Sequence, residues 1–167
     1  MNHFQFNSYN STIDSIQSVI AQMQLIEQEL HESDMQNLIY FNKTYLIITQ
    51  NVSSKFHTNY FQNDTAMNSF DICFAKYYFE ALNSFVKSQN SDPAWQILFE
   101  SCKKNNLLKT QYLALGVNAH VNNDLAFSIE DSKLNPIPAS DYQKINHIIT
   151  RSLHQVFKSY KEVGPLN

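Results

Sequence analysis

The sequence predicts an all-α protein of one domain. Its 167 residues include only two glycines and four prolines, fewer than the turns of a β-sheet normally need. No stretch shows the sustained alternation of apolar and polar residues that marks a half-buried strand. A chain of this length suits one domain that buries about 70% of its unfolded surface. We therefore expect a single bundle of about six helices over residues 1–167.

Apolar residues recur at spacings of three and four in five segments that lie before or after the central helix. We expect helices over about 12–31, 35–52, 68–87, 93–104 and 140–160. Residues 1–10 lack any period and predict a loose arm. Residues 53–67 are polar, aromatic and rich in asparagine, which predicts a long loop that is either functional or an ordinary surface excursion.

The centre of the bundle is expected to be a helix over about residues 106–128. Its first half is apolar on nearly every side, which is typical of a buried helix. Its second half carries five polar candidates for ligand binding: Asn118, His120, Asn122, Asn123 and Asp124. Burying one unpaired polar group costs about 2–7 kcal/mol, so these side chains need partners. Gly116 costs about 1 kcal/mol against alanine in a helix, which predicts a close neighbour or ligand there.

Helical geometry decides which of these groups act together. At about 100° per residue, His120 and Asp124 share a face, with Asn123 beside them. Asn118 and Asn122 share a different face. Two further candidates for the pocket are Asp71 and Tyr78 on the 68–87 helix. Asp71 also has a structural interpretation, because a carboxylate in the first turn favours the helix dipole.

Three functions stay open. The first is a pocket that binds a small polar molecule. The alternative for the same residues is that His120 and Asp124 form a buried hydrogen-bonded pair with a purely structural role. The second is a hydrolase of phosphoesters or similar substrates, because a histidine and an aspartate one turn apart can bind one divalent metal ion. The third is a non-enzymatic interaction module that uses the aromatic segment FAKYYF. His147, Arg151 and His154 line one stripe of the last helix, which we expect to be solvated.

Composition excludes several other classes. Twelve basic and fifteen acidic residues give no electrostatic case for binding nucleic acid or an anionic membrane. No apolar run reaches the roughly 18 residues of a membrane span, and no secretory signal precedes the first helix, so we expect a cytoplasmic protein. Cys73 and Cys102 have no metal-binding spacing and are expected to be buried free thiols. The oligomeric state is not predicted.

The stretch LGVNAHVNNDL, residues 115–125, resembles the signature LGxNAHxNxDL of an uncharacterised bacterial family. The segments FNKTYLIIT, DICFAKYYFEAL, PAW and DYQKIN fit the same pattern in the same order, so the resemblance covers about residues 35–150. It implies a helical fold and no established activity. The positions that match are Asn42, Tyr45, Asp71, Phe74, Tyr78, Trp95, Gly116, Asn118, His120, Asp124 and Asn146.

The same stretch is also similar to the ligand helix of zinc-dependent phospholipases C, in the pattern L-G-x-x-x-H-x-x-x-D. That resemblance implies that His120 and Asp124 bind a metal ion. The chain departs from those enzymes, because it has neither their N-terminal tryptophan ligand nor a second His-x-x-x-Asp or His-x-x-x-Glu motif. A trinuclear zinc site is therefore not expected, and one divalent ion is the most that the resemblance implies.

Overall fold

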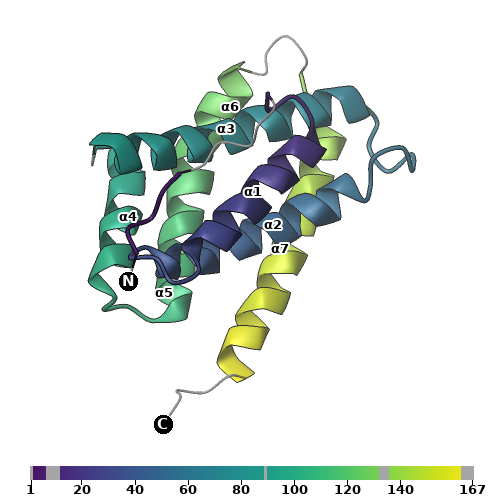
Figure 1. Ribbon diagram of the computed structural model, residues 1–167. Helices are drawn as coiled ribbons and strands as arrows, with labels where there is room; N and C mark the ends of the chain where they lie inside the picture. The colour runs from purple at the N-terminus through teal and green to yellow at the C-terminus, as the bar shows by residue number, and fades with distance from the viewer. Residues whose placement is uncertain (1, 7–11, 89, 132–135, 163–167) are drawn as a thin grey trace.

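The computed structural model describes residues 2–6, 12–88, 90–131 and 136–162 and is an all-α bundle (Figure 1). Its elements are α1 (Ile16–Leu30), η1 (Gln36–Leu38), α2 (Ile39–Ser53), α3 (Asp64–Ser88), α4 (Pro93–Lys104), α5 (Lys109–Val117), η2 (Asn118–Asp124), α6 (Leu125–Asp131) and α7 (Ala139–Glu162). Since α5, η2 and α6 form one continuous helix, the expectation of an all-α bundle of about six helices is confirmed for the described ranges.

The first helix begins later than predicted. Ser15 caps α1: its Oγ accepts a hydrogen bond from the Ser18 amide at 3.2 Å, and the Ser18 Oγ accepts one from the Ser15 amide at 3.1 Å. The prediction of a loose arm is wrong for residues 2–6, because Phe4 is 1% exposed and its amide donates to Asp34 Oδ1 at 2.8 Å. Residues 7–10 of that predicted arm lie outside the described residues.

The loop predicted over 53–67 is shorter than expected. It connects Ser53 to Asp64, and α3 begins four residues before the predicted start at Asn68. The earlier start has a local cause, because the Asn63 side chain accepts a hydrogen bond from the Ala66 amide at 3.0 Å and so acts as a cap. Phe61, in this loop, packs into the core.

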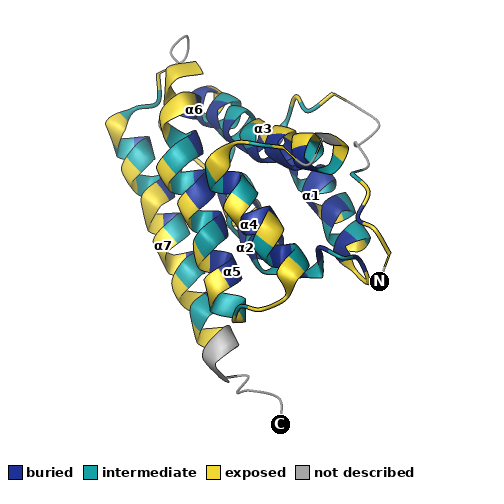
Figure 2. Ribbon diagram, turned by 90° about the vertical axis from the view of Figure 1, so that its left-hand side faces the viewer, coloured by how far each residue is buried: buried dark blue, intermediate teal, exposed yellow. Residues whose placement is uncertain are grey.

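Buried side chains face the inside of the bundle and exposed ones lie on its outer surface, as the burial pattern in Figure 2 shows. Phe41 of α2 lies at the centre, in edge contact with Tyr78 and Trp95. Gly116 lies against it so closely that a Cβ atom there would be 2.4 Å from Phe41 Cγ. The predicted close approach at Gly116 is therefore confirmed. No helix in the described part of the chain has the length and apolar character needed to cross a bilayer.

Candidate functional site

The central helix changes its geometry where its polar residues begin. Residues 118–124 form the π-helical segment η2, which widens the turn between the α-helical segments α5 and α6. Most π-helical segments are single turns inside α-helices, and they are frequent at functional sites. Because the prediction assumed a regular helix of 100° per residue, it did not foresee this widening.

His120 and Asp124 form a buried pair within η2. His120 Nδ1 lies 2.9 Å from Asp124 Oδ2, and the two residues are only 3% and 2% exposed. The carboxylate also accepts hydrogen bonds from Trp95 Nε1, at 3.0 Å to Oδ2 and 3.2 Å to Oδ1, and from Asn123 Nδ2 at 3.0 Å. With three side chains donating to it, Asp124 is an acceptor, so Nδ1 of His120 carries the proton. The lone pair of the imidazole is therefore on Nε2.

Aromatic rings hold the imidazole in place. The Phe74 ring stacks on it with centroids 3.6 Å apart and planes 10° apart, and the Tyr45 ring lies 4.4 Å away. Burial lowers the pKa of His120, and the hydrogen bond and charge of Asp124 act in the opposite direction. The imidazole is consequently neutral at pH 7 and acts as an acceptor at Nε2.

His120 lines a cavity between α2, α3, the central helix (α5, η2 and α6) and α7. This cavity offers about 70 Å³ to the centres of water-sized molecules, and aliphatic and aromatic side chains form most of its wall. The His120 Nε2 atom itself is inaccessible to solvent. No donor or acceptor in the described ranges lies within hydrogen-bonding distance of this buried nitrogen.

Asp71 of α3 lines the same cavity. The residue as a whole is half-buried, yet its Oδ2 atom is inaccessible to solvent and has no hydrogen-bond partner among the described residues. Burial raises the pKa of Asp71 to about 8, so most of the carboxyl is protonated at pH 7 and can donate a hydrogen bond. Burial, followed by the charges of Asp71 and Asp124, raises the pKa of Tyr45.

The structure separates the other predicted ligand-binding residues from the cavity. Asn118 and Asn122 are exposed and bond to each other, with Asn122 Nδ2 2.7 Å from Asn118 Oδ1. Asn123 Nδ2 donates a hydrogen bond to Asp124 Oδ1. Tyr78 is fully buried, and its hydroxyl donates to Asn42 Oδ1 at 3.2 Å, so it belongs to the packing of the core.

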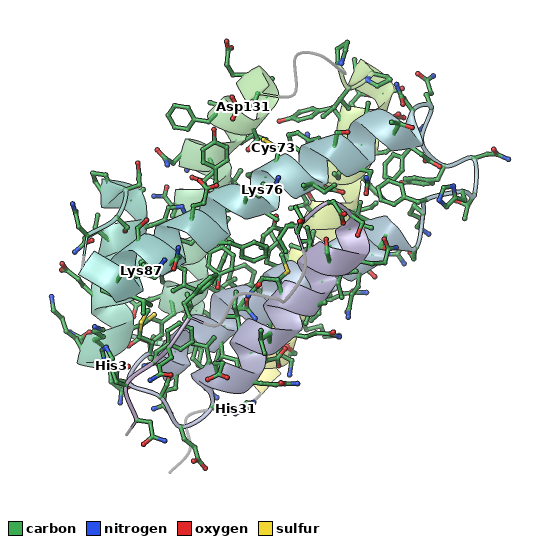
Figure 3. The ribbon with its side chains drawn as sticks, turned by 45° about the horizontal axis from the view of Figure 1, so that its top comes forward. His3, His31, Cys73, Lys76, Lys87 and Asp131 are labelled. Atoms are coloured by element: carbon green, nitrogen blue, oxygen red, sulfur yellow. The ribbon has the colours of Figure 1, made fainter. Side chains whose placement is uncertain are left out.

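The stripe on the last helix is solvated, as expected, because all three of its members are exposed: His147, Arg151 and His154. The aromatic segment FAKYYF supplies core side chains instead of an open face, with Phe74, Tyr78 and Phe79 buried. Both cysteines are free; Cys102 is buried, whereas Cys73 is half-buried. Cys73 lies beside Asp131 (Figure 3), 3.9 Å from its Oδ2, and does not line the cavity.

His120 and Asp124, as the described part of the chain places them, lack the further ligands of a divalent-metal site. His120 and Asp124 bond to each other, so they do not turn ligand atoms towards one shared ion. Metal sites in proteins generally need three or more protein ligands. Within the described ranges no group of three histidine, cysteine, aspartate or glutamate side chains is close enough to supply them.

Trp95 is the residue of this site that the sequence interpretation missed. The indole N–H of this buried tryptophan donates to Asp124. The signal was present in general form, since a buried tryptophan usually finds an acceptor for its N–H. Which acceptor it finds depends on how α4 packs against η2, and the spacing of residues does not show that.

Comparison with known proteins gives a family and no further relative. The model of the family of unknown function DUF5995 matches residues 16–167. The chain belongs to this family. The uncharacterised-family resemblance is therefore confirmed, and the match also includes α1 and the whole of α7. No curated protein and no solved structure matches the chain significantly.

Proposed function

We propose that this member of DUF5995 binds a small molecule that has an apolar body and one hydroxyl group. The binding site is the cavity beside His120. The observation that carries the proposal is His120 Nε2, a buried acceptor with no partner among the described residues, on a side chain that lines an apolar cavity. A buried polar atom of this kind costs free energy unless a partner satisfies it.

The wall of the cavity indicates the ligand's shape and polarity. Phe41, Tyr45 and Phe74 present aromatic surface, and Ile48, Ile145 and Leu125 are among the aliphatic residues that line the rest. Burial of apolar area contributes about 25 cal/mol per Å², so an apolar body supplies most of the affinity. His120 Nε2 accepts a hydrogen bond and the protonated Asp71 donates one, which together select a hydroxyl group. The sequence predicted a polar ligand, whereas this cavity favours an amphipathic one.

Phenol and toluene are matched probes, because they differ only in a hydroxyl and a methyl group. We expect phenol to bind about tenfold more tightly than toluene, the effect of one hydrogen bond to a buried acceptor. Titration calorimetry measures the two affinities. Phenol should also shift the ¹⁵N resonance of His120 Nε2, whereas toluene should not.

His120→Asn is the decisive variant. Its amide can still donate to Asp124 in place of Nδ1, but it has no counterpart of Nε2. We expect it to bind toluene and to lose the preference for phenol. His147→Gln, on the exposed face of α7, should keep the preference. If neither probe binds the native protein, or if both bind equally well, the proposal is wrong.

A further inference from the structure

A polar groove lies between the end of α2, the loop that follows it and α7. It offers about 460 Å³ to the centres of water-sized molecules, several times the space of the cavity beside His120. Five of its lining residues are exposed, so the groove is open to solvent: Asn51, Ser54, His147, Arg151 and Gln155. The others are Lys55, Tyr60, Ile148 and Ser152. The groove shares no lining residue with the cavity beside His120 and is therefore a separate site.

The groove is lined by positive side chains. Lys55 and Arg151 both line it, and Arg151 is the only arginine of the chain. No aspartate or glutamate is among its lining residues. Neither Lys55 nor Arg151 forms an ion pair with a carboxylate in the described part of the chain. In a chain with a net charge of −3, two such cations beside one groove favour an anion there.

The end of α2 would ordinarily oppose an anion, because the carbonyl groups of a last helical turn carry partial negative charge. Here those carbonyls already accept hydrogen bonds. Gln50 O accepts one from the Ser54 amide at 3.0 Å, and Val52 O accepts one from the Lys55 amide at 2.9 Å. The carbonyl of Asn51 accepts one from Ser54 Oγ at 2.7 Å. An anion in the groove consequently meets less repulsion from the helix end, and the two cations decide the sign of the site.

Contacts across the groove fix its shape. Lys144 Nζ donates to the Tyr60 carbonyl at 2.6 Å, which ties the loop to α7. Asn51 Nδ2 donates to Ser152 Oγ at 3.0 Å, which ties α2 to the same helix. The Lys55 ammonium lies over the Tyr60 ring, 5.5 Å from its centroid, so this cation is positioned against the loop. A site whose walls are already ordered loses less free energy on binding than one that has to be ordered first.

We propose that this groove binds a phosphate group, free or carried by a small molecule, with Arg151 and Lys55 as its two cationic contacts. The charges match, because a phosphate monoester carries about −1.5 to −2 near pH 7. A guanidinium donates two parallel hydrogen bonds to phosphate oxygens, and an ammonium acts as a point charge. The ring of His147, which also lines the groove, supplies a further N–H donor. A carboxylate has a single charge and would leave one cation unpaired.

Glycerol 3-phosphate and glycerate are matched probes, because both are small and hydroxylated and they differ in the anionic group. At pH 7.5 and low salt, we expect calorimetry to give glycerol 3-phosphate a Kd of about 1 mM or below. Glycerate should bind at least about tenfold more weakly, the effect of one charge-assisted contact. Because Arg151 is exposed, the Kd should rise as NaCl increases from about 50 mM to about 500 mM.

Inorganic phosphate distinguishes the two sources of the group. Weaker binding than that of glycerol 3-phosphate would assign the groove to an ester, and equal or tighter binding would assign it to free phosphate. Either result supports a phosphate site.

The single arginine locates the ligand. Its Nε–H gives one resonance of its own in a ¹⁵N spectrum, since the chain has no other arginine. Glycerol 3-phosphate should shift that resonance with a midpoint equal to the calorimetric Kd. Glycerate at the same concentration should shift it much less.

Four variants test the two contacts. Arg151→Gln should raise the Kd for glycerol 3-phosphate about tenfold, and Arg151→Lys, which keeps the charge without the fork, should raise it less. Lys55→Gln should raise it about two- to fivefold, the range of a solvated ion pair. Lys43→Gln is the matched control, because Lys43 is an exposed lysine of α2 that does not line the groove, and it should bind like the native protein. Circular dichroism checks that each variant is folded.

Several results would overturn the proposal. Glycerate binding as tightly as the phosphate would show that the groove does not select a phosphate group. A Kd that does not change with salt, or equal effects of Lys55→Gln and Lys43→Gln, would remove the electrostatic basis. If the Arg151 resonance stays in place and Arg151→Gln binds like the native protein, the phosphate binds elsewhere. The phenol measurements concern a different site, so their outcome does not affect these results.

Discussion

Two aspartates, Asp141 and Asp71, are placed in opposite ways in the same bundle. Asp141, at the start of α7, is 0% exposed and accepts hydrogen bonds from the amides of Gln62 and Asn63 and from Lys144 Nζ, at 2.8–3.1 Å. Asp71, in the wall of the cavity, has a buried oxygen with no partner among the described residues. One carboxylate joins a loop to a helix, and the other leaves hydrogen-bonding capacity for a ligand.

The pKa values of the two aspartates reflect this difference in hydrogen-bond partners. Burial on its own would raise the pKa of Asp141, but hydrogen bonds from Gln62 and Asn63 and the ammonium group of Lys144 together hold it below the ordinary range. Burial raises the pKa of Asp71 to about 8 because nothing offsets it. Burial alone therefore does not identify a functional carboxylate. A buried carboxylate without partners is the stronger indication.

Removing the partnered carboxylate should have the largest effect. Asp141→Ala leaves the Gln62 and Asn63 amides and the Lys144 ammonium without their acceptor, and we expect the free energy of unfolding to fall by about 3 kcal/mol. Urea denaturation at pH 7 measures the loss. Because the pKa of Asp141 is lowered, its contribution is present above the ordinary carboxyl pKa of about 4 and is lost as the pH falls through its folded value. A loss that is equally large at pH 2 would contradict this account.

Trp95→Phe removes one of the three side chains that donate hydrogen bonds to Asp124. The carboxylate then has fewer partners, which makes it more like Asp71. We expect a loss of about 2 kcal/mol, typical of a hydrogen bond to a charged group. Ile97→Ala is the matched control on the same helix, because Ile97 is 58% exposed and should change stability by less than about 0.5 kcal/mol. Both are read from urea denaturation. Equal effects of the two substitutions would show that the indole N–H does not support Asp124.

The smallest expected effect is a gain in stability, from Asp71→Asn. Asp71→Asn resembles the protonated acid, so it removes the cost of ionising a buried carboxyl. We expect the variant to be more stable than the native protein by about 1 kcal/mol at pH 8, after allowing for the partial exposure of the residue. Since the pKa is raised, native stability is fully present below about pH 4 and is lost as the pH rises through about 8. Thermal denaturation at pH 4 and at pH 8 should show the difference growing with pH; a constant difference would contradict it.

The sequence predicted the central features of the fold and part of the site. Spacing alone placed His120 and Asp124 on one face, which their 2.9 Å contact confirms, and it predicted the close neighbour of Gly116. Those inferences concern residues about one turn apart in a single helix, and the wider turn of η2 still leaves them on one face. The same argument put Asn118 and Asn122 on another face, and their mutual hydrogen bond agrees with it.

What the sequence did not predict depends on contacts between distant segments. The cavity lies between α2, α3, the central helix and α7, and no spacing within one helix shows that these elements leave a space there. The role of Trp95 depends on the packing of α4, and the lack of a partner for Asp71 depends on every neighbour at once. The predicted loose arm was wrong at Phe4 because its burial depends on Asp34, thirty residues away.

The π-helical segment has a consequence for how sequences of this family are compared. Each wide turn takes up more residues than an α-helical turn does, so α6 is offset in register from α5. A helical wheel counted onward from Leu113 therefore misplaces the side chains after Asp124, among them the buried Ser128. The wheel has to start again at Leu125, and alignments that insert or delete a residue between 118 and 124 would change which side chains meet the interior.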